Sequence, residues 1–207
     1  MFKVSEKLYS VQSKQWPVSG PHISGSFDSD SIVVYQAYNP TIATAAATHQ
    51  NFIDNNEMYN PTRMTWFKPN FLWMMYRSGW ATKLNQDAVL AIRVRRSWLE
   101  QVLCEAALSG GPKLCKSARA VVQWDPDHSP DGAKHPHRRD LQVGIRGSLA
   151  VEWSQGNRGP AIVEITDITG YVRNAHFLWR SEGDFPRPAE VVYDAPPAVR
   201  ENLEMDV

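Results

Sequence analysis

Short segments of β-branched and aromatic residues, separated by turns that contain proline or glycine, recur along the middle of this 207-residue chain. Such segments are typical of buried or half-buried β-strands. They predict strands at 31–37, 63–67, 71–76, 88–94, 118–124, 141–145, 149–153 and 161–168. The segment 71–76 (FLWMMY) is apolar on both faces, so a helix remains the alternative to a central strand there.

Two stretches instead have helical spacing. Asn39 and Pro40 supply a helix cap and a first-turn proline. Ser97 and Glu100 have the spacing of a capping box at the start of a second helix. Strands outnumber helices, and the helices come early, so we expect an α+β fold: one domain with a mixed or antiparallel sheet and two main helices.

Composition divides the chain into three parts. Residues 1–30 are polar and predict a loose N-terminal arm, 31–182 predict the single α+β domain, and 183–207 predict a Pro-rich acidic tail. The formal net charge is +0, which argues against a chain that binds nucleic acid by charge alone. The two cysteines are too few for a disulfide framework, and the start of the chain has no signal-peptide core. We therefore expect a cytoplasmic protein (nuclear if eukaryotic) with no membrane segment.

The segment 125–137 combines acidic and histidine side chains in a long polar stretch. The residues that suggest a metal site are Asp125, Asp127, His128, His135 and His137. They lack the spacing of a helix or strand that would direct several ligands at one ion. We expect a solvated loop here and no metal.

The block 63–96 points most strongly to chemistry. Its aromatic centre lies between Lys68 on one side and Arg77 and Lys83 on the other. Guanidinium groups bind phosphates and aromatic faces stack on rings, so an anionic ligand with a flat ring would suit this block. The alternative is a plain core segment with solvated charges at its ends.

A second block, 138–147, places Asp140, Gln142 and Arg146 at alternate positions and thus on one face of a strand. An acid, an amide and a guanidinium on one face suggest a site. The alternative is the solvent-facing side of an antiparallel sheet.

These segments resemble the domain-of-unknown-function family 4291 of bacteria and fungi. The matching elements are VVYQAYNPTIA at 33–43, RMTWFKPNFLWMMYRSGWATK at 63–83 with NQDAVLAI after it, and LQVGIRG at 141–147. Together they cover most of residues 31–170.

The order of elements is also similar to ADP-ribosyltransferases, especially those that modify nucleic-acid bases. This similarity implies an ADP-ribosyltransferase-like fold, NAD as a substrate, and transfer of ADP-ribose to an acceptor such as a nucleobase. It implies catalytic roles for Gln36, Gln142 and Asp140, with Glu152 as another acidic candidate, and cofactor contacts from Tyr35, Arg63, Lys68, Trp73, Tyr76 and Arg77, with Trp80 as a further stacking ring. The chain departs from that pattern at Gln36, where the transferases usually have His or Arg, and it has no obvious catalytic glutamate.

Two other classes of function stay open. A non-catalytic module could bind nucleic acid or protein through exposed tryptophans and a set of arginines: Arg93, Arg95, Arg96, Arg138 and Arg139. A small-molecule enzyme could use the same pocket without NAD.

Overall fold

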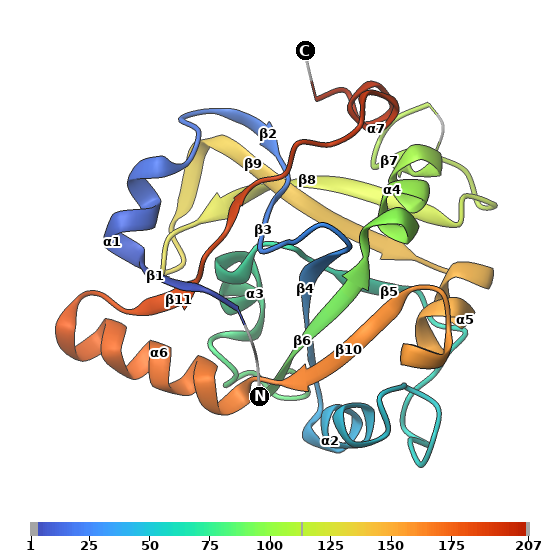
Figure 1. Cartoon of the computed structure of the whole chain (residues 1–207), viewed down its shortest axis with the longest axis horizontal. Helices are drawn as coiled ribbons and strands as arrows, with labels where there is room; N and C mark the ends of the chain where they lie inside the picture. Colours follow the sequence, from blue (N-terminus) through green and yellow to red (C-terminus); the bar gives the residue numbers. More distant parts are fainter. Residues whose placement is uncertain (1–3, 113, 206–207) are drawn as a thin grey trace.

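Two larger β-sheets, two two-stranded sheets and the helices around them make up the described part of the fold (Figure 1). The computed structural model describes residues 4–112 and 114–205, and within them it has twelve strands, seven α-helices and two 3-10 helices. The strands are β1 (Glu6–Leu8), β2 (Gly20–His22), β3 (Ser24–Gly25), β4 (Ser31–Tyr38), β5 (Thr65–Phe67), β6 (Ala88–Arg95), β7 (Ala107–Leu108), β8 (Ala120–His128), β9 (Lys134–Ile145), β10 (Ile162–Asp167), β11 (Pro186–Pro188) and β12 (Val191–Val192). The helices are α1 (Tyr9–Gln12), η1 (Ser13–Gln15), α2 (Pro40–His49), α3 (Phe71–Ser78), α4 (Arg96–Glu105), α5 (Ser148–Ser154), η2 (Gly156–Arg158), α6 (Thr169–Glu182) and α7 (Pro197–Asn202).

The first sheet is antiparallel, with the strand order β10–β6–β4. Both of its faces are buried, because alternate residues of β4 enter two different cores. Ile32 and Val34 belong to the larger core, and Val33 and Tyr35 belong to a smaller core that includes residues of α3 and α6. Burial on both faces explains why β4 is a continuous apolar run rather than an alternating one.

The second sheet has the order β2–β9–β8–β7, and β5 also pairs with β9. The pairs β2–β9 and β7–β8 are parallel, and the pairs β8–β9 and β5–β9 are antiparallel. The prediction of one α+β domain with mixed and antiparallel strands is therefore confirmed.

The segment 71–76 is part of the helix α3, so the prediction of a central strand is wrong and its helical alternative is confirmed. Asn70 caps this helix by accepting a hydrogen bond from Trp73 N at 2.9 Å, and Gly79, with φ of 59°, ends it. The helix contacts β4 and β8 and so lies between the two sheets (Figure 1). Because protein covers both sides, the helix is apolar nearly all round, and no periodicity distinguishes it from a strand.

The predicted strand at 149–153 is also wrong, because these residues belong to α5. Leu149 and Trp153, four residues apart, are 4% and 0% exposed, whereas Val151 between them is 49% exposed. That pattern is one buried helical face. A five-residue window is too short to separate it from the alternation of a strand.

The segment 125–137, predicted as a long loop, is mostly strand. β8 runs to His128 and β9 begins at Lys134, and these two residues are paired across the hairpin. A hydrogen bond of 3.0 Å from Ser129 N to Ala133 O closes the turn between them. The hairpin end carries few apolar residues, so the sequence gives no alternating pattern there.

The expectation of two main helices is wrong, since the described residues form seven α-helices. The longest, α6, buries only Val172 and Ala175 fully. The predicted capping box is not formed either: α4 begins at Arg96, so Ser97 already lies inside its first turn, and no side chain caps the helix. No helix in residues 4–112 or 114–205 is both long and apolar enough to span a lipid bilayer.

The two ends of the described chain are held against the domain, in contrast to the expected loose arm and tail. β1 pairs with β11, and β3 pairs with β12. Tyr9 stacks on Phe185 with 5.8 Å between ring centroids, and Ile23 and Leu203 are both 0% exposed. Segments whose composition is typical of an arm or a tail can still be ordered, as the short proline-containing strands β2 and β11 show.

Candidate functional site

A cavity of about 1030 Å³ lies where the two sheets and α3 meet. Its lining comes from the end of β4, the segment that leads into β5, one side of α3, and the facing parts of β8 and β9. This volume is at the upper end of the range for small-molecule sites in proteins.

Six residues singled out from the sequence line this cavity: Gln36, Arg63, Lys68, Trp73, Arg77 and Gln142. Arg63 and Arg77 are exposed, whereas Lys68 is only 2% exposed. The cavity therefore has guanidinium groups at its mouth and a buried ammonium or amine group deeper inside.

Tyr35 and Tyr76, also predicted as ligand contacts, lie outside the cavity lining. Tyr35 is 0% exposed in the smaller core, where its ring meets Phe71 edge-on at 5.5 Å. Tyr76 stacks on His128, with ring centroids 3.8 Å apart and an interplanar angle of 15°.

The additional candidates Trp80 and Glu152 are outside it as well. Trp80 Nε1 donates to Pro130 O at 3.1 Å, and Glu152 accepts a hydrogen bond of 2.7 Å from Trp98 Nε1 on α4. Both side chains hold neighbouring elements together and do not face the cavity.

Gln36 is fixed in one orientation by three hydrogen bonds. Its Nε2 donates to Thr65 Oγ1 at 3.0 Å and to Trp66 O at 2.9 Å, and its Oε1 accepts from Tyr38 OH at 2.9 Å. These bonds join β4 to β5 at the cavity wall. Gln36 therefore shapes the site, with little of its hydrogen-bonding capacity left for a ligand.

Lys68 directly follows β5, and its backbone forms an isolated bridge with Tyr35. Its Nζ lies 3.9 Å from the centroid of the Trp73 ring. Burial lowers the pKa of the Lys68 ammonium group to about 7, the charge of Asp125 acts in the opposite direction, and the charge of Arg77 adds to the lowering. Lys68 is therefore close to half-protonated at neutral pH.

Sequence reasoning assigned no catalytic or ligand role to Asp125, and among the described residues it is the only carboxylate in the cavity lining. It pairs with Asp140 across the hairpin, two pairs along from Gln123 and Gln142. Gln142 Nε2 donates to Gln123 Oε1 at 3.2 Å, and both amides line the cavity. Burial raises the pKa of Asp125, with Lys68 partly opposing the shift. Only the pairing of β8 with β9 groups these residues. Because the sequence predicted a loop at 125–137, this pairing was not expected.

Trp66 is the second residue that the sequence did not single out. It lines the cavity and lies across Gly144 of β9, where an added Cβ would come within 2.8 Å of the indole. Trp73, the predicted stacking ring, is 7% exposed and already faces Lys68. Trp66 is thus better placed than Trp73 to stack on a ligand.

Asp140, predicted as catalytic, lies outside the cavity lining and is 1% exposed. Its Oδ2 accepts a hydrogen bond of 2.7 Å from Asn70 Nδ2, the cap of α3. Asp127 also accepts from Asn70, at 3.3 Å, and forms an ion pair of 2.6 Å with Arg138. Burial, together with the neighbouring Asp127, raises the pKa of Asp140 well above its usual value. Asp140 therefore holds the start of α3, the helix that carries Trp73 and Arg77.

The C-terminal segment also contacts the start of α3. Glu190 Oε1 accepts a hydrogen bond of 2.7 Å from Phe71 N, and Glu190 is ion-paired with the fully buried Arg187. Burial raises the pKa of Glu190 to about 7. A carboxylate is favourable at a helix N-terminus, where the helix dipole is positive.

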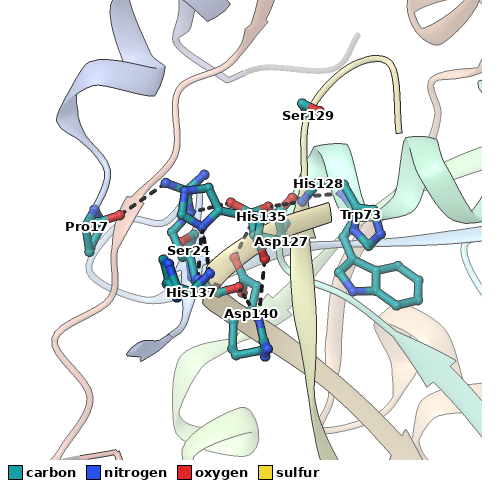
Figure 2. A network of polar contacts seen from close by, with 12 residues as sticks. Pro17, Ser24, Trp73, Asp127, His128, Ser129, His135, His137 and Asp140 are labelled. Atoms are coloured by element: carbon teal, nitrogen blue, oxygen red, sulfur yellow. Dashed lines mark hydrogen bonds and ion pairs between the residues drawn. The ribbon is translucent and has the colours of Figure 1, made fainter. Parts of the chain in front are cut away.

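The histidines of the hairpin have separate partners. Figure 2 shows His128, His135 and Asp127 near one another, with Trp73 beside His128. His128 stacks on Tyr76, and His135 Nδ1 accepts a hydrogen bond of 2.9 Å from Arg138 N. Among residues 4–112 and 114–205, no three His, Cys, Asp or Glu side chains are arranged to hold a metal ion.

The arginines of the alternative binding module are bound within the protein. Arg93 pairs with Asp28 at 3.0 Å, and Arg138 pairs with Asp127. Arg95, Arg96 and Arg139 donate to backbone carbonyl groups. These groups form no free row of cations for a nucleic-acid backbone.

A comparison with protein-family models identifies one family over most of the chain, while no curated protein matches the sequence. The matching model, Domain of unknown function (DUF4291), covers residues 22–193. It covers the sheet β10–β6–β4, the strands β5, β7, β8 and β9, the helix α3 and every residue of the cavity lining. The chain therefore belongs to the DUF4291 family.

Proposed function

We propose that the cavity binds NAD as a substrate and that the protein transfers its ADP-ribose group to an acceptor such as a nucleobase. The observation that carries the proposal is the grouping of Arg77, Trp66 and Gln142, from three separate elements, around one cavity. Cations, an aromatic face and amides are the groups that phosphates, a nucleobase or nicotinamide ring, and ribose hydroxyls require.

The proposal includes an ADP-ribosyltransferase-like fold, and the order of the elements is its second support. Strand β4 is followed by Asn39-Pro40 and helix α2, and strand β6 runs into helix α4, as the similarity to ADP-ribosyltransferases implies. The aromatic segment between them is a helix, which departs from that similarity. The proposal therefore depends on the cavity more than on the order of elements.

Each group in the cavity has a role in this proposal. Arg63 and Arg77 at the mouth bind the pyrophosphate oxygens. Positive charge develops on the ribose as the nicotinamide leaves, and Asp125 and the Gln142 amide oxygen face that charge. Asp125 is half-buried and its Oδ2 atom is shielded from solvent, which increases the strength of this interaction.

Thermal unfolding tests whether NAD binds. NAD at ten times its dissociation constant should add about 1.4 kcal/mol to the free energy of unfolding. For a domain of this size that corresponds to a rise of roughly 2–4 °C in Tm. ADP-ribose should give a similar rise, and S-adenosylmethionine should give none. A rise with S-adenosylmethionine but not with NAD would contradict the proposal.

Replacing Gln142 should separate turnover from binding. Gln142→Ala removes one of the two cavity amides that pair next to the Asp125 region of the hairpin. We expect the rate of nicotinamide release to fall by about tenfold to a hundredfold, since one polar group that stabilises a transition state supplies a few kcal/mol. The NAD affinity should stay within about twofold of wild type, because the interaction is made mainly in the transition state. Equal losses of rate and affinity would assign Gln142 to binding alone.

A further inference from the structure

Lys68 differs from both common kinds of lysine in proteins. Surface lysines are hydrated, and buried lysines are normally paired with a carboxylate. Lys68 is 2% exposed and lines the cavity, and its side chain forms no hydrogen bond or ion pair with any residue that the structure describes. Its Nζ contacts the Trp73 ring at 3.9 Å and is free to meet a ligand.

The surroundings of Lys68 favour a neutral, nucleophilic amine. Burial is the largest effect on its pKa, which falls to about 7, and the Arg77 guanidinium lowers it further. The face of the Trp73 ring favours the charged ammonium form of Lys68, but its effect on the pKa is smaller than the effect of burial. Lysines made reactive in proteins are desolvated or lie near another cation, and Lys68 meets both conditions.

We propose that Lys68 Nζ is a nucleophile that forms an imine with an aldehyde or ketone carrying an anionic group. The anionic group follows from the mouth of the cavity, where Arg63 and Arg77 are exposed. This activity goes beyond NAD binding and does not depend on it, because it needs only the cavity and the amine.

The step balances without any oxidant or reductant. The lone pair of the neutral amine attacks the carbonyl carbon, a C–N bond forms, and the proton of the nitrogen passes to the former carbonyl oxygen. An acid then donates a second proton to that oxygen, the C–O bond breaks and water leaves, and the remaining N–H proton returns to the acid, so an amine and a carbonyl give an imine and one water molecule.

Asp125 is the acid that donates a proton to the leaving oxygen. It lines the same cavity and is near enough to Lys68 for each charge to shift the pKa of the other group. Burial raises the pKa of Asp125, and its Oδ2 has no hydrogen-bond partner among the described residues. A carboxyl group with a raised pKa can carry a proton close to neutral pH.

Reductive trapping tests the proposal with the full chain. The probe is pyridoxal 5′-phosphate, an aldehyde with an anionic group, added at pH 7 with sodium cyanoborohydride, and labelled lysines are located by peptide mass spectrometry. Lys68 should be labelled at least about tenfold faster than the exposed Lys116 and Lys134, because burial lowers the pKa of Lys68 and so favours its neutral amine. Unphosphorylated pyridoxal should label Lys68 more slowly than the phosphorylated probe does.

Two variants connect the labelling to the mechanism. Asp125→Asn should slow the labelling of Lys68 by about tenfold, since general acid catalysis typically contributes that much or more, and leave the labelling of Lys116 unchanged. Lys68→Arg should abolish the label at position 68 and leave the surface labels.

Labelling of Lys68 no faster than that of Lys116 would overturn the proposal. Equal rates with pyridoxal and its phosphate would overturn the anionic substrate class. NAD is absent from this experiment, so its outcome is independent of whether NAD binds.

Discussion

Replacing Gly156 with alanine should lower the free energy of unfolding by more than about 3 kcal/mol. Gly156 has φ of +61°, and a Cβ built on it would lie 1.9 Å from Gln50 O and 2.4 Å from Asn51 Cα. Both contacts are with backbone, so neither can be relieved by turning a side chain. The backbone after α2 must therefore move away from η2.

That movement would disturb a tightly connected part of the fold. Gln50 O accepts a hydrogen bond of 2.9 Å from Asn157 N, and the Gln50 side chain bonds to both the N–H and the C=O of Ile165. Phe52, two residues further on, is 0% exposed in the larger core. Relieving the clash at position 156 would therefore disturb contacts of α2, β10 and the larger core at the same time.

Gly183→Ala is the matched control, since Gly183 has φ of +74° and no atom within 4 Å of an added Cβ. Gly183→Ala should lower the free energy of unfolding by only about 1–2 kcal/mol, the cost of placing alanine in a left-handed backbone conformation. The measurement is chemical unfolding of both variants at 25 °C. Equal losses of unfolding free energy in the two variants would show that the close approach of η2 to Gln50 does not restrict the side chain at position 156.

Replacing Lys68 with methionine should stabilise the protein most below pH 7 and progressively less as the pH rises to 10. Burial lowers the pKa of Lys68 to about 7 in the folded state, whereas an unfolded lysine titrates near its ordinary value of 10.5. Below pH 7 both states are charged and the full cost of burying the charge is present. Between these two values the unfolded state binds more protons, so wild-type stability rises with pH.

The size of this effect follows from linkage. The advantage of Lys68→Met over wild type should shrink by about 1 kcal/mol for each pH unit between 7 and 10. Urea unfolding at pH 6, 7, 8, 9 and 10 measures it, with Lys116→Met, at an exposed position, as the control for general effects of charge. A constant difference between Lys68→Met and wild type over this range would mean that Lys68 is not desolvated.

The sequence grouped residues of the cavity lining more accurately than it predicted the local structure. Lys68, Trp73 and Arg77 were singled out because cations bracket an aromatic run, and this holds whether the run is a strand or a helix. The helix was missed because its first five residues, 71–75, are all buried, so the segment 71–76 shows no polar face. Periodicity carries no information about an element that is buried all round.

Asp125 was missed for a different physical reason. Its position in the cavity depends on the register of β8 against β9, which pairs Asp125 with Asp140 and Gln123 with Gln142. A register is set by contacts between segments and is not encoded in either strand alone. Likewise, Glu190 contacts α3 from a Pro-rich segment whose composition is typical of a tail. Contacts of this kind between distant parts of the chain require the folded structure.

Calorimetric titration of NAD tests the central claim, that the cavity between the two sheets is a ligand site. The titration compares the wild type with Arg77→Ala at the mouth of the cavity and with Arg180→Ala, an exposed arginine of α6 outside it. We predict that NAD binds the wild type and Arg180→Ala equally, and binds Arg77→Ala about tenfold or more weakly, since a charge-assisted hydrogen bond to phosphate contributes at least about 1.4 kcal/mol. Equal affinity for all three proteins, or no binding to the wild type, would contradict the claim.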